Sequence, residues 1–176
     1  MKTRINTLND ALAFILQGLH FTETRLTEEF GSCSNQMTSA PLKGEIDNYT
    51  SSSKDKLLKL ERVFNYLLKE PMTRTNDVIN DLIKETKEIL ASTTSTHLKD
   101  VLSIGCVQNI NAYKISGYRS AYMFAVELEP DTVTDLLQQI LEWELETSKV
   151  LHRLSIEEFN RSQRSPKLKD YAWEID

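Results

Sequence analysis

The chain has 176 residues, of which 40% are hydrophobic and 27% are charged, and its formal net charge at pH 7 is −5. A chain of this length can bury one sizeable core, and the few glycines and prolines are typical of a globular helical protein. Binding to nucleic acid needs a concentrated basic face, which this acidic balance disfavours. No segment approaches the roughly 20 apolar residues that span a bilayer, and no secretory signal is evident, so we expect a cytoplasmic protein that binds no membrane. Cys33 and Cys106 have no metal-binding or redox spacing, and we expect buried or free thiols.

Apolar residues recur at helical spacing through the first half of the chain. The spacing predicts one helix over residues 5–31, ending at Gly31, and a second over residues 41–69, with a loop at residues 32–36 between them. Such a short connection makes the two helices antiparallel neighbours. Glu23 falls on the apolar stripe of the first helix. The predicted inward positions of the second are Ile46, Tyr49, Ser53, Leu57, Leu60, Phe64 and Leu67.

The residue pattern in the second half of the chain predicts three further helices and no strand. Pro71 interrupts the pattern, and Thr75 or Asn76 can cap a short connecting helix that ends near Leu90. A long helix follows over residues 97–128, and a last one runs from Pro130 to about residue 158 with Glu144 on its apolar face. The inward face of the long helix is predicted to hold Leu102, Ile104, Val107, Asn111, Ile115, Tyr118 and Tyr122. We therefore expect an all-α domain over residues 1–160 and a C-terminal tail over residues 161–176.

Five segments occur in an order that resembles a known family. They are residues 19–26, 57–64, 82–85, 108–118 and 136–138. The first reads Leu-His-Phe-Thr-Glu-Thr-Arg-Leu and is similar to Leu-Tyr-x-Ala-Glu-x-Gln-Leu of the bacterial ferritin-like proteins of the YciE and YciF type, which are associated with stress responses. The fourth resembles Gln-Lys-Val-Glu-His-Tyr-Glu-Ile-Ala-Ala-Tyr of the same family. The resemblance implies a ferritin-like four-helix bundle with an additional connecting helix between the second and third bundle helices. It also implies a homodimer.

The resemblance breaks down at the metal ligands. Ferritin-like di-metal sites take one Glu from each of two helices and a Glu/His pair from each of the other two. The alignment keeps only Glu23 and Glu144 as carboxylates. The other aligned positions hold Tyr49 and Ser52 in the second helix, Asn111 and Lys114 in the third, and Trp143 and Ser148 in the fourth. Two carboxylates beside an ammonium group are a poor site for two divalent ions. We therefore expect these positions to be vestigial, with no metal and no cofactor.

Two buried carboxylates without partners would be costly, because desolvation and mutual repulsion both disfavour their charged forms. The ammonium group of Lys114 can lie between Glu23 and Glu144, with Tyr49 and Asn111 supplying hydrogen bonds. In the alternative, Lys114 extends to solvent and one of the two carboxyl groups stays protonated.

The leading functional prediction is a non-catalytic structural or interaction protein, related to stress responses as the resemblance implies. One alternative is a metal-binding protein with a mononuclear site rebuilt from Glu23, Glu144 and His20, with Tyr49 as a further ligand. Another is a small-ligand binder that uses the bundle centre. No nucleophile with an oriented base emerges, so catalysis is not favoured. The surplus of apolar helix positions also favours a homodimer, with the surplus at Met123, Phe124 and Trp143.

Overall fold

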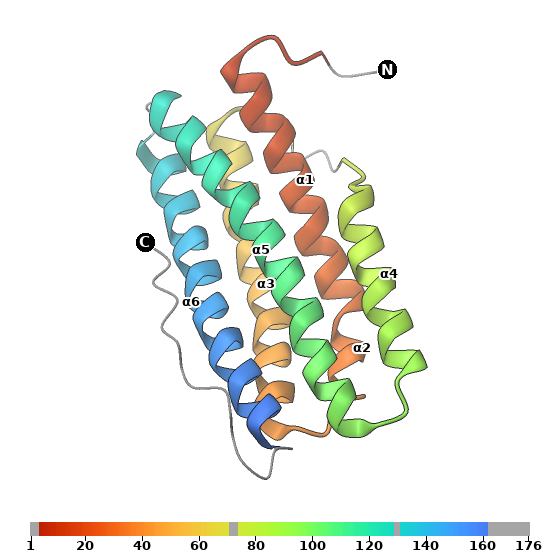
Figure 1. Cartoon of the computed structure of the whole chain (residues 1–176). Coiled ribbons are helices and arrows are strands. Elements are labelled where there is room, and N and C mark those ends of the chain that lie inside the picture. The colour runs from red at the N-terminus through yellow and green to blue at the C-terminus, as the bar shows by residue number, and fades with distance from the viewer. Residues whose placement is uncertain (1–3, 71–73, 129–130, 162–176) are drawn as a thin grey trace.

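The computed structural model describes residues 4–70, 74–128 and 131–161 of the chain (Figure 1). These residues form helices and connecting segments, without a strand. The helices are α1 (Leu8–Glu29), α2 (Gly31–Ser34), α3 (Ala40–Tyr66), α4 (Asp77–Ser92), α5 (Thr96–Leu128) and α6 (Asp131–Arg161). The all-α fold predicted from the sequence is confirmed. The predicted tail lies almost entirely outside the described residues.

The four long helices form a bundle in which each helix is antiparallel to the two beside it, and α3 and α5 run in the same direction (Figure 1). Helices α1 and α3 are one antiparallel pair, and α5 and α6 are the other; α1 also packs against α5, and α3 against α6. Helix α4 lies outside this ring, against α5 and α1, and returns the chain from the end of α3 to the start of α5. The bundle with an additional connecting helix is therefore the predicted architecture.

Local sequence explains several helix ends. The hydroxyl of Thr7 accepts the backbone N–H of Asp10 at 3.1 Å, while the Asp10 carboxylate accepts the backbone N–H of Thr7 at 3.1 Å. This reciprocal capping box satisfies donors that have no partner within the first turn of α1. Helix α3 has Pro41 in its first turn, where a missing N–H costs little. Just beyond its end, Leu68 has φ 52°, in the left-handed region that favours glycine.

Two apolar clusters form the core, one toward each end of the bundle. One contains Leu26, Phe30, Ile46, Ile104, Val107, Ile110 and Leu151, among others. The second includes Leu12, Leu16, Leu60, Phe64, Tyr118, Leu137 and Ile140. On each of the four long helices, the residues of one cluster are separated along the chain from those of the other by a buried charged residue. The centre of the bundle is thus a polar layer between two apolar ones.

Asp100, near the start of α5, joins three parts of the chain. Its buried carboxylate accepts the backbone N–H groups of Thr38 and Ser39 at 2.9 and 3.0 Å, and the hydroxyl of Thr38 at 2.6 Å. Arg161 of α6 reaches the same carboxylate at 3.3 Å. These bonds fix the segment that leads into α3 against the ends of α5 and α6.

Some local predictions were wrong. The predicted loop at residues 32–36 contains the short helix α2, and Cys33 within it is buried; both Cys33 and Cys106 are free thiols, as expected. Leu102 is 42% exposed instead of facing the core. The residue before α4 is Asn76, but its side chain does not cap the helix and donates to the hydroxyl of Tyr113 on α5. At Asn76 a tertiary contact replaces the helix cap that the local sequence predicted.

Candidate functional site

Four charged side chains meet at the bundle centre, one from each long helix. Glu23 comes from α1, Lys56 from α3, Lys114 from α5 and Glu144 from α6, and each has 0% relative exposure. Each also lies on the helix face that carries the core residues on either side of it. We call these four residues the central ion cluster. Its formal charge is zero, because two ammonium groups face two carboxylates.

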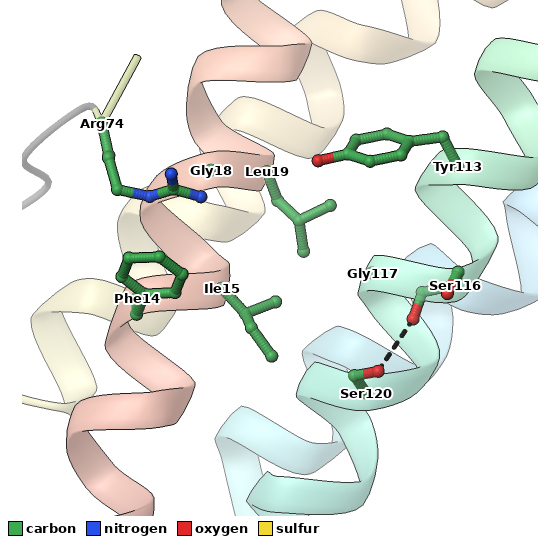
Figure 2. A pocket seen from close by; sticks show the side chains of 9 residues that line it. All are labelled: Phe14, Ile15, Gly18, Leu19, Arg74, Tyr113, Ser116, Gly117 and Ser120. Atoms are coloured by element: carbon green, nitrogen blue, oxygen red, sulfur yellow. Dashed lines mark hydrogen bonds between the residues drawn. The ribbon is translucent and has the colours of Figure 1, made fainter. Parts of the chain in front are cut away.

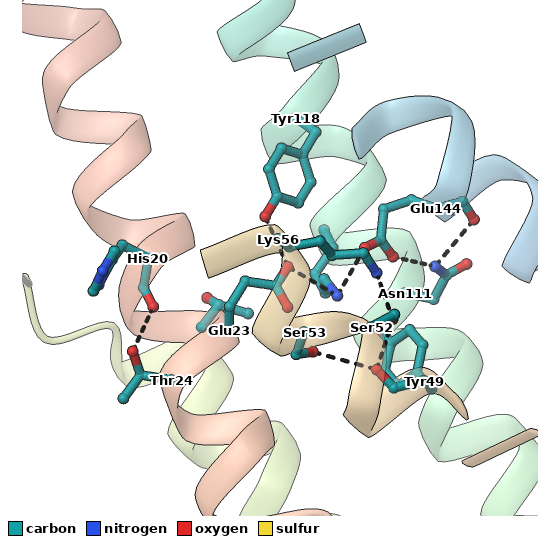
Figure 3. Close-up of polar contacts among 12 residues, drawn as sticks. His20, Glu23, Thr24, Tyr49, Ser52, Ser53, Lys56, Asn111, Tyr118 and Glu144 are labelled. Atoms are coloured by element: carbon teal, nitrogen blue, oxygen red, sulfur yellow. Dashed lines mark hydrogen bonds and ion pairs between the residues drawn. The ribbon is translucent and has the colours of Figure 1, made fainter. Parts of the chain in front are cut away.

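Lys114 joins the two carboxylates. Its Nζ lies 2.9 Å from Glu23 Oε1 and 2.8 Å from Glu144 Oε1. Lys56 approaches the same Glu144 oxygen at 2.5 Å, so Glu144 has two ammonium partners and Glu23 has one. Figure 3 shows the side chains of Glu23, Lys56 and Glu144 converging from their helices. Three of the four possible Lys–Glu pairs are thus formed.

Neutral neighbours complete the polar layer. Tyr118 donates its hydroxyl hydrogen to Glu23 Oε1 at 2.7 Å, and Asn111 donates from Nδ2 to Glu144 Oε2 at 2.7 Å (Figure 3). Ser52 accepts from Lys56 Nζ at 3.1 Å. The ring of Tyr49 lies beneath both ammonium groups, 4.5 Å from Lys114 Nζ and 5.3 Å from Lys56 Nζ. Charge-assisted hydrogen bonds and cation–π contacts therefore offset part of the desolvation of the four charges.

The charges in this layer are strongly coupled. Burial lowers the pKa of the Lys114 ammonium, but the Glu144 and Glu23 carboxylates outweigh burial and hold that pKa well above its usual range. Burial raises the pKa of Glu144, but Lys114 and then Lys56 outweigh burial and hold it below the ordinary value. Burial and the neighbouring Lys114 lower the pKa of Lys56. Lys114 is therefore the firmly charged centre of the cluster.

The two tyrosines of the layer keep their protons. Burial, and next the charge of Glu23, raises the pKa of Tyr118 well above its usual range, and burial also raises that of Tyr49. Tyr118 therefore acts as a hydrogen-bond donor to Glu23.

The sequence prediction for Lys114 is confirmed, because its ammonium group lies between the two carboxylates. Asn111 supplies the hydrogen bond expected of it, whereas Tyr49 contributes its ring. Lys56 was missed. Its signal was the spacing: it lies seven positions after Tyr49 and four before Leu60, on the same helix face as both.

Other predicted positions lie at or beyond the edge of the layer. Ser52 is half-buried and reaches the cluster only through Lys56. Ser148 lines a cleft on the outer side of α5 and α6 and does not join the central cluster. The ring of His20 packs edge-on against Phe64 of α3, with 6.1 Å between centroids, and burial lowers its pKa.

The residues present at the centre do not fit a pair of metal ions. The ammonium groups of Lys114 and Lys56 contact the carboxylate oxygens that a metal would need. Among the described residues, there is no group of three or more His, Cys, Asp or Glu side chains that could hold a metal ion. The described helices also include none that is long and apolar enough to cross a membrane.

The fold and its centre together define an all-α four-helix bundle with a buried ion cluster. The chain belongs to the family described as a domain of unknown function, DUF892, which matches residues 7–164. It is 22% identical over 158 residues to Protein YciF of Escherichia coli K12, covering 89% of this chain and 95% of YciF. The resemblance to the YciF type is thereby confirmed.

Solved structures share the fold. The crystal structure of the E. coli stress protein YciF matches with a TM-score of 0.86 and 20% identity, covering 89% of this chain and 99% of that one. YcfI of Rhodopseudomonas palustris, for which a structural role has been suggested, matches with a TM-score of 0.83 and 22% identity over 86% of this chain and 97% of its own. A protein from Xanthomonas campestris matches with a TM-score of 0.66 and 15% identity, covering 89% of this chain and 98% of that one.

Proposed function

We propose that this chain is a non-catalytic structural or interaction protein of the YciF type, in which internal ammonium groups replace the metals of a ferritin-like centre. The observation that carries the proposal is the contact of Lys114 with both Glu23 and Glu144 at 2.9 and 2.8 Å. A cation at that point repels a divalent ion and removes two ligands from it. The positions of Tyr49, Ser52, Asn111 and Ser148 are then vestigial, since none of these side chains supplies the carboxylate or imidazole ligand of a ferritin-like site.

The stress context comes from the relatives. YciF is described as a stress protein, and this chain matches nearly the whole of it. We propose that this chain also acts under stress, through contacts with other proteins rather than through redox chemistry.

Elemental analysis of protein purified without chelators tests the loss of the metals. We expect well under one iron, manganese or zinc ion per chain, before and after incubation with an excess of each metal. Binding of two ions per chain would overturn the proposal. A single ion that is lost from Glu23→Gln and from His20→Ala would support the mononuclear alternative. That alternative requires His20 to leave Phe64 and turn toward the centre.

We also propose that the chain forms a homodimer. Met123 is 61% exposed and lines a cleft of about 600 Å³ between α5 and α6, together with Ile115 and Leu145. Covering apolar area of this kind with a second copy lowers the free energy of the protein in water. Phe124 is a weaker contributor, because it packs against the core, and the Trp143 ring is engaged by Lys59 at 5.0 Å.

Light scattering at micromolar concentration tests the dimer. We expect twice the mass of one chain for the wild type and one chain's mass for Met123→Glu. The control is Leu58→Glu on α3, because Leu58 is 60% exposed and therefore comparable. The control should leave the dimer intact. A monomeric wild type would contradict the proposal.

A further inference from the structure

A second cleft lies on the surface between α1 and α5, away from the central ion cluster (Figure 2). Its volume is about 270 Å³, which is near the lower end of the range for small-molecule sites. Its walls combine apolar and polar residues: Phe14, Ile15, Gly18, Leu19, Arg74, Tyr113, Ser116, Gly117 and Ser120. The cleft takes no part in the central ion cluster.

Arg74 supplies a positive charge at one wall. Its guanidinium carbon lies 3.9 Å from the centroid of the Phe14 ring, so the aromatic face holds the group in place. Its Nε is buried and lacks a hydrogen-bond partner within the described part of the chain. The residues that line the cleft include no carboxylate to neutralise it. An arginine that is positioned but not paired is suited to binding an anion from outside.

Tyr113 supplies a hydroxyl group at the opposite wall. Its oxygen accepts a hydrogen bond from Asn76 Nδ2, which leaves the hydroxyl hydrogen of Tyr113 available as a donor. In Figure 2 this hydroxyl and the guanidinium of Arg74 lie on two sides of the cleft, with the apolar side chains of Leu19 and Ile15 between them. The cleft therefore offers the cation of Arg74 and the hydroxyl donor of Tyr113 around an apolar surface.

Two glycines keep the cleft open. A Cβ atom at Gly18 would lie 2.9 Å from Nη2 of Arg74, and one at Gly117 would lie 2.9 Å from Cδ2 of Leu19. Either methyl group would push a lining side chain out of its present position. The absence of a side chain at each point therefore shapes both the position of Arg74 and the apolar floor.

We propose that this cleft binds a small monocarboxylate whose body is apolar or aromatic. A single guanidinium matches a single carboxylate charge, and its two parallel N–H groups fit the two oxygens. The apolar surface of Ile15 and Leu19 then packs against the body of the ligand. Inorganic phosphate fits less well, because it has no apolar body to cover the hydrocarbon surface of Ile15 and Leu19.

Titration with benzoate, followed by amide NMR signals of the intact chain, tests the proposal. We expect saturable shifts of the Gly18 and Gly117 signals at millimolar benzoate, and binding at least about tenfold weaker for benzamide, its neutral analogue. Inorganic phosphate should shift these signals less than benzoate does. The signal of Gly44, a surface glycine of α3 with nothing near its Cβ position, should not move.

Single substitutions distinguish benzoate binding in the cleft from a general effect of positive surface charge. Arg74→Gln should raise the Kd for benzoate about tenfold or more, whereas Arg62→Gln, which removes an exposed arginine from α3, should leave it unchanged. Gly117→Ala should weaken binding by displacing Leu19, with Gly44→Ala as its matched control. A melting curve for each variant checks that a loss of benzoate binding does not come from a loss of folding. Arg74→Lys keeps the charge without the paired N–H groups and so gives a second test of the bidentate contact.

Each possible result of these experiments either supports or overturns the proposed carboxylate site. The proposal is overturned by unchanged glycine signals, by equal binding of benzoate and benzamide, or by full affinity in a folded Arg74→Gln variant. Preferential binding of phosphate would also overturn it, because the ligand class would then be wrong. Charge-dependent binding that is lost with Arg74 and weakened in Gly117→Ala supports it.

Discussion

Replacing Lys114 by Met removes the one ammonium group that contacts both buried carboxylates. Met fills a similar volume without charge, so packing is largely kept. Glu144 retains Lys56 at 2.5 Å and Asn111 at 2.7 Å. Glu23 retains only the hydroxyl of Tyr118 at 2.7 Å. The cluster goes from neutral to a net charge of −1, and Glu23 is the side chain left without a cation.

The expected loss is about 3–5 kcal/mol, the usual scale for breaking a buried ion pair by removing one partner. The free energy of protonating a carboxyl group sets an independent bound on this loss of unfolding free energy. Keeping a carboxyl group protonated costs about 1.4 kcal/mol for each pH unit above its ordinary pKa of about 4.3, which gives about 3.7 kcal/mol at pH 7. The two figures agree, and the loss is a large fraction of a typical unfolding free energy of about 5–15 kcal/mol.

Urea unfolding followed by circular dichroism measures this loss, and its pH dependence identifies the cause. In Lys114→Met, the penalty should shrink from about 3.7 kcal/mol at pH 7 to about 1 kcal/mol at pH 5, as a proton replaces the lost cation. The wild type should behave differently. The pKa of Glu144 is depressed in the fold by Lys114 and Lys56 against burial, so its contribution to stability is present above the ordinary pKa of a Glu carboxyl and is lost as pH falls through the lower pKa of the folded state.

Two controls sharpen the result. Adding Glu23→Gln to Lys114→Met restores a neutral cluster, and this double variant should recover at least about half of the loss. Lys84→Met removes a lysine whose partner Glu88 lies 3.8 Å away on the surface, and it should cost about 1 kcal/mol or less. A Lys114→Met protein that unfolds like the wild type at pH 7, or a double variant no more stable than the single one, would refute the reasoning.

Three further changes test other parts of the fold by the same urea assay. Leu68→Gly should stabilise the protein by about 1 kcal/mol, because Leu68 has φ 52° and is 95% exposed, so strain is relieved and little packing is lost; no gain would argue against strain there. Asp100→Ala should cost on the order of 3 kcal/mol, since it removes the acceptor for two backbone N–H groups and for Arg161; a change below about 1 kcal/mol would mean that water replaces it. Thr7→Ala should cost about 1 kcal/mol through loss of the capping box at α1, and an unchanged midpoint would show that the first turn is not part of the cooperative unit.

Most helices were predictable because apolar residues mark one face of α1, α3 and α6 over several turns, whereas the apolar residues of α5 are spread around the helix. Only part of the central ion cluster could be predicted from the sequence. Lys114 could be placed because the resemblance aligned it with a carboxylate position beside Glu23 and Glu144. Lys56 was missed in spite of its helical spacing, because it lies in a polar stretch with exposed Lys54 and Asp55, where a lysine at a single position is more often solvated than buried.

The sequence also could not predict the contact between Asn76 and Tyr113 or the hydrogen bonds of Asp100. Asn76 lies 37 positions from Tyr113, and Asp100 lies 62 positions from Thr38. Local patterns carry information over a few residues, so they predict which segments are helical. They do not say which polar groups meet once the helices pack.

The distribution of signs in the central ion cluster bears on how the halves of the molecule recognise each other. The pair α1 and α3 brings one negative and one positive side chain, and so does the pair α5 and α6. The bonds between Lys114 and Glu23 and between Lys56 and Glu144 both cross from one pair to the other. Sliding one hairpin along the other by a single turn, about 5.4 Å, would part every cross-pair contact and leave charges facing hydrocarbon. The four side chains therefore fix the relative position of the two helix pairs along the bundle axis. The remaining apolar residues of the two facing surfaces would be compatible with more than one alignment.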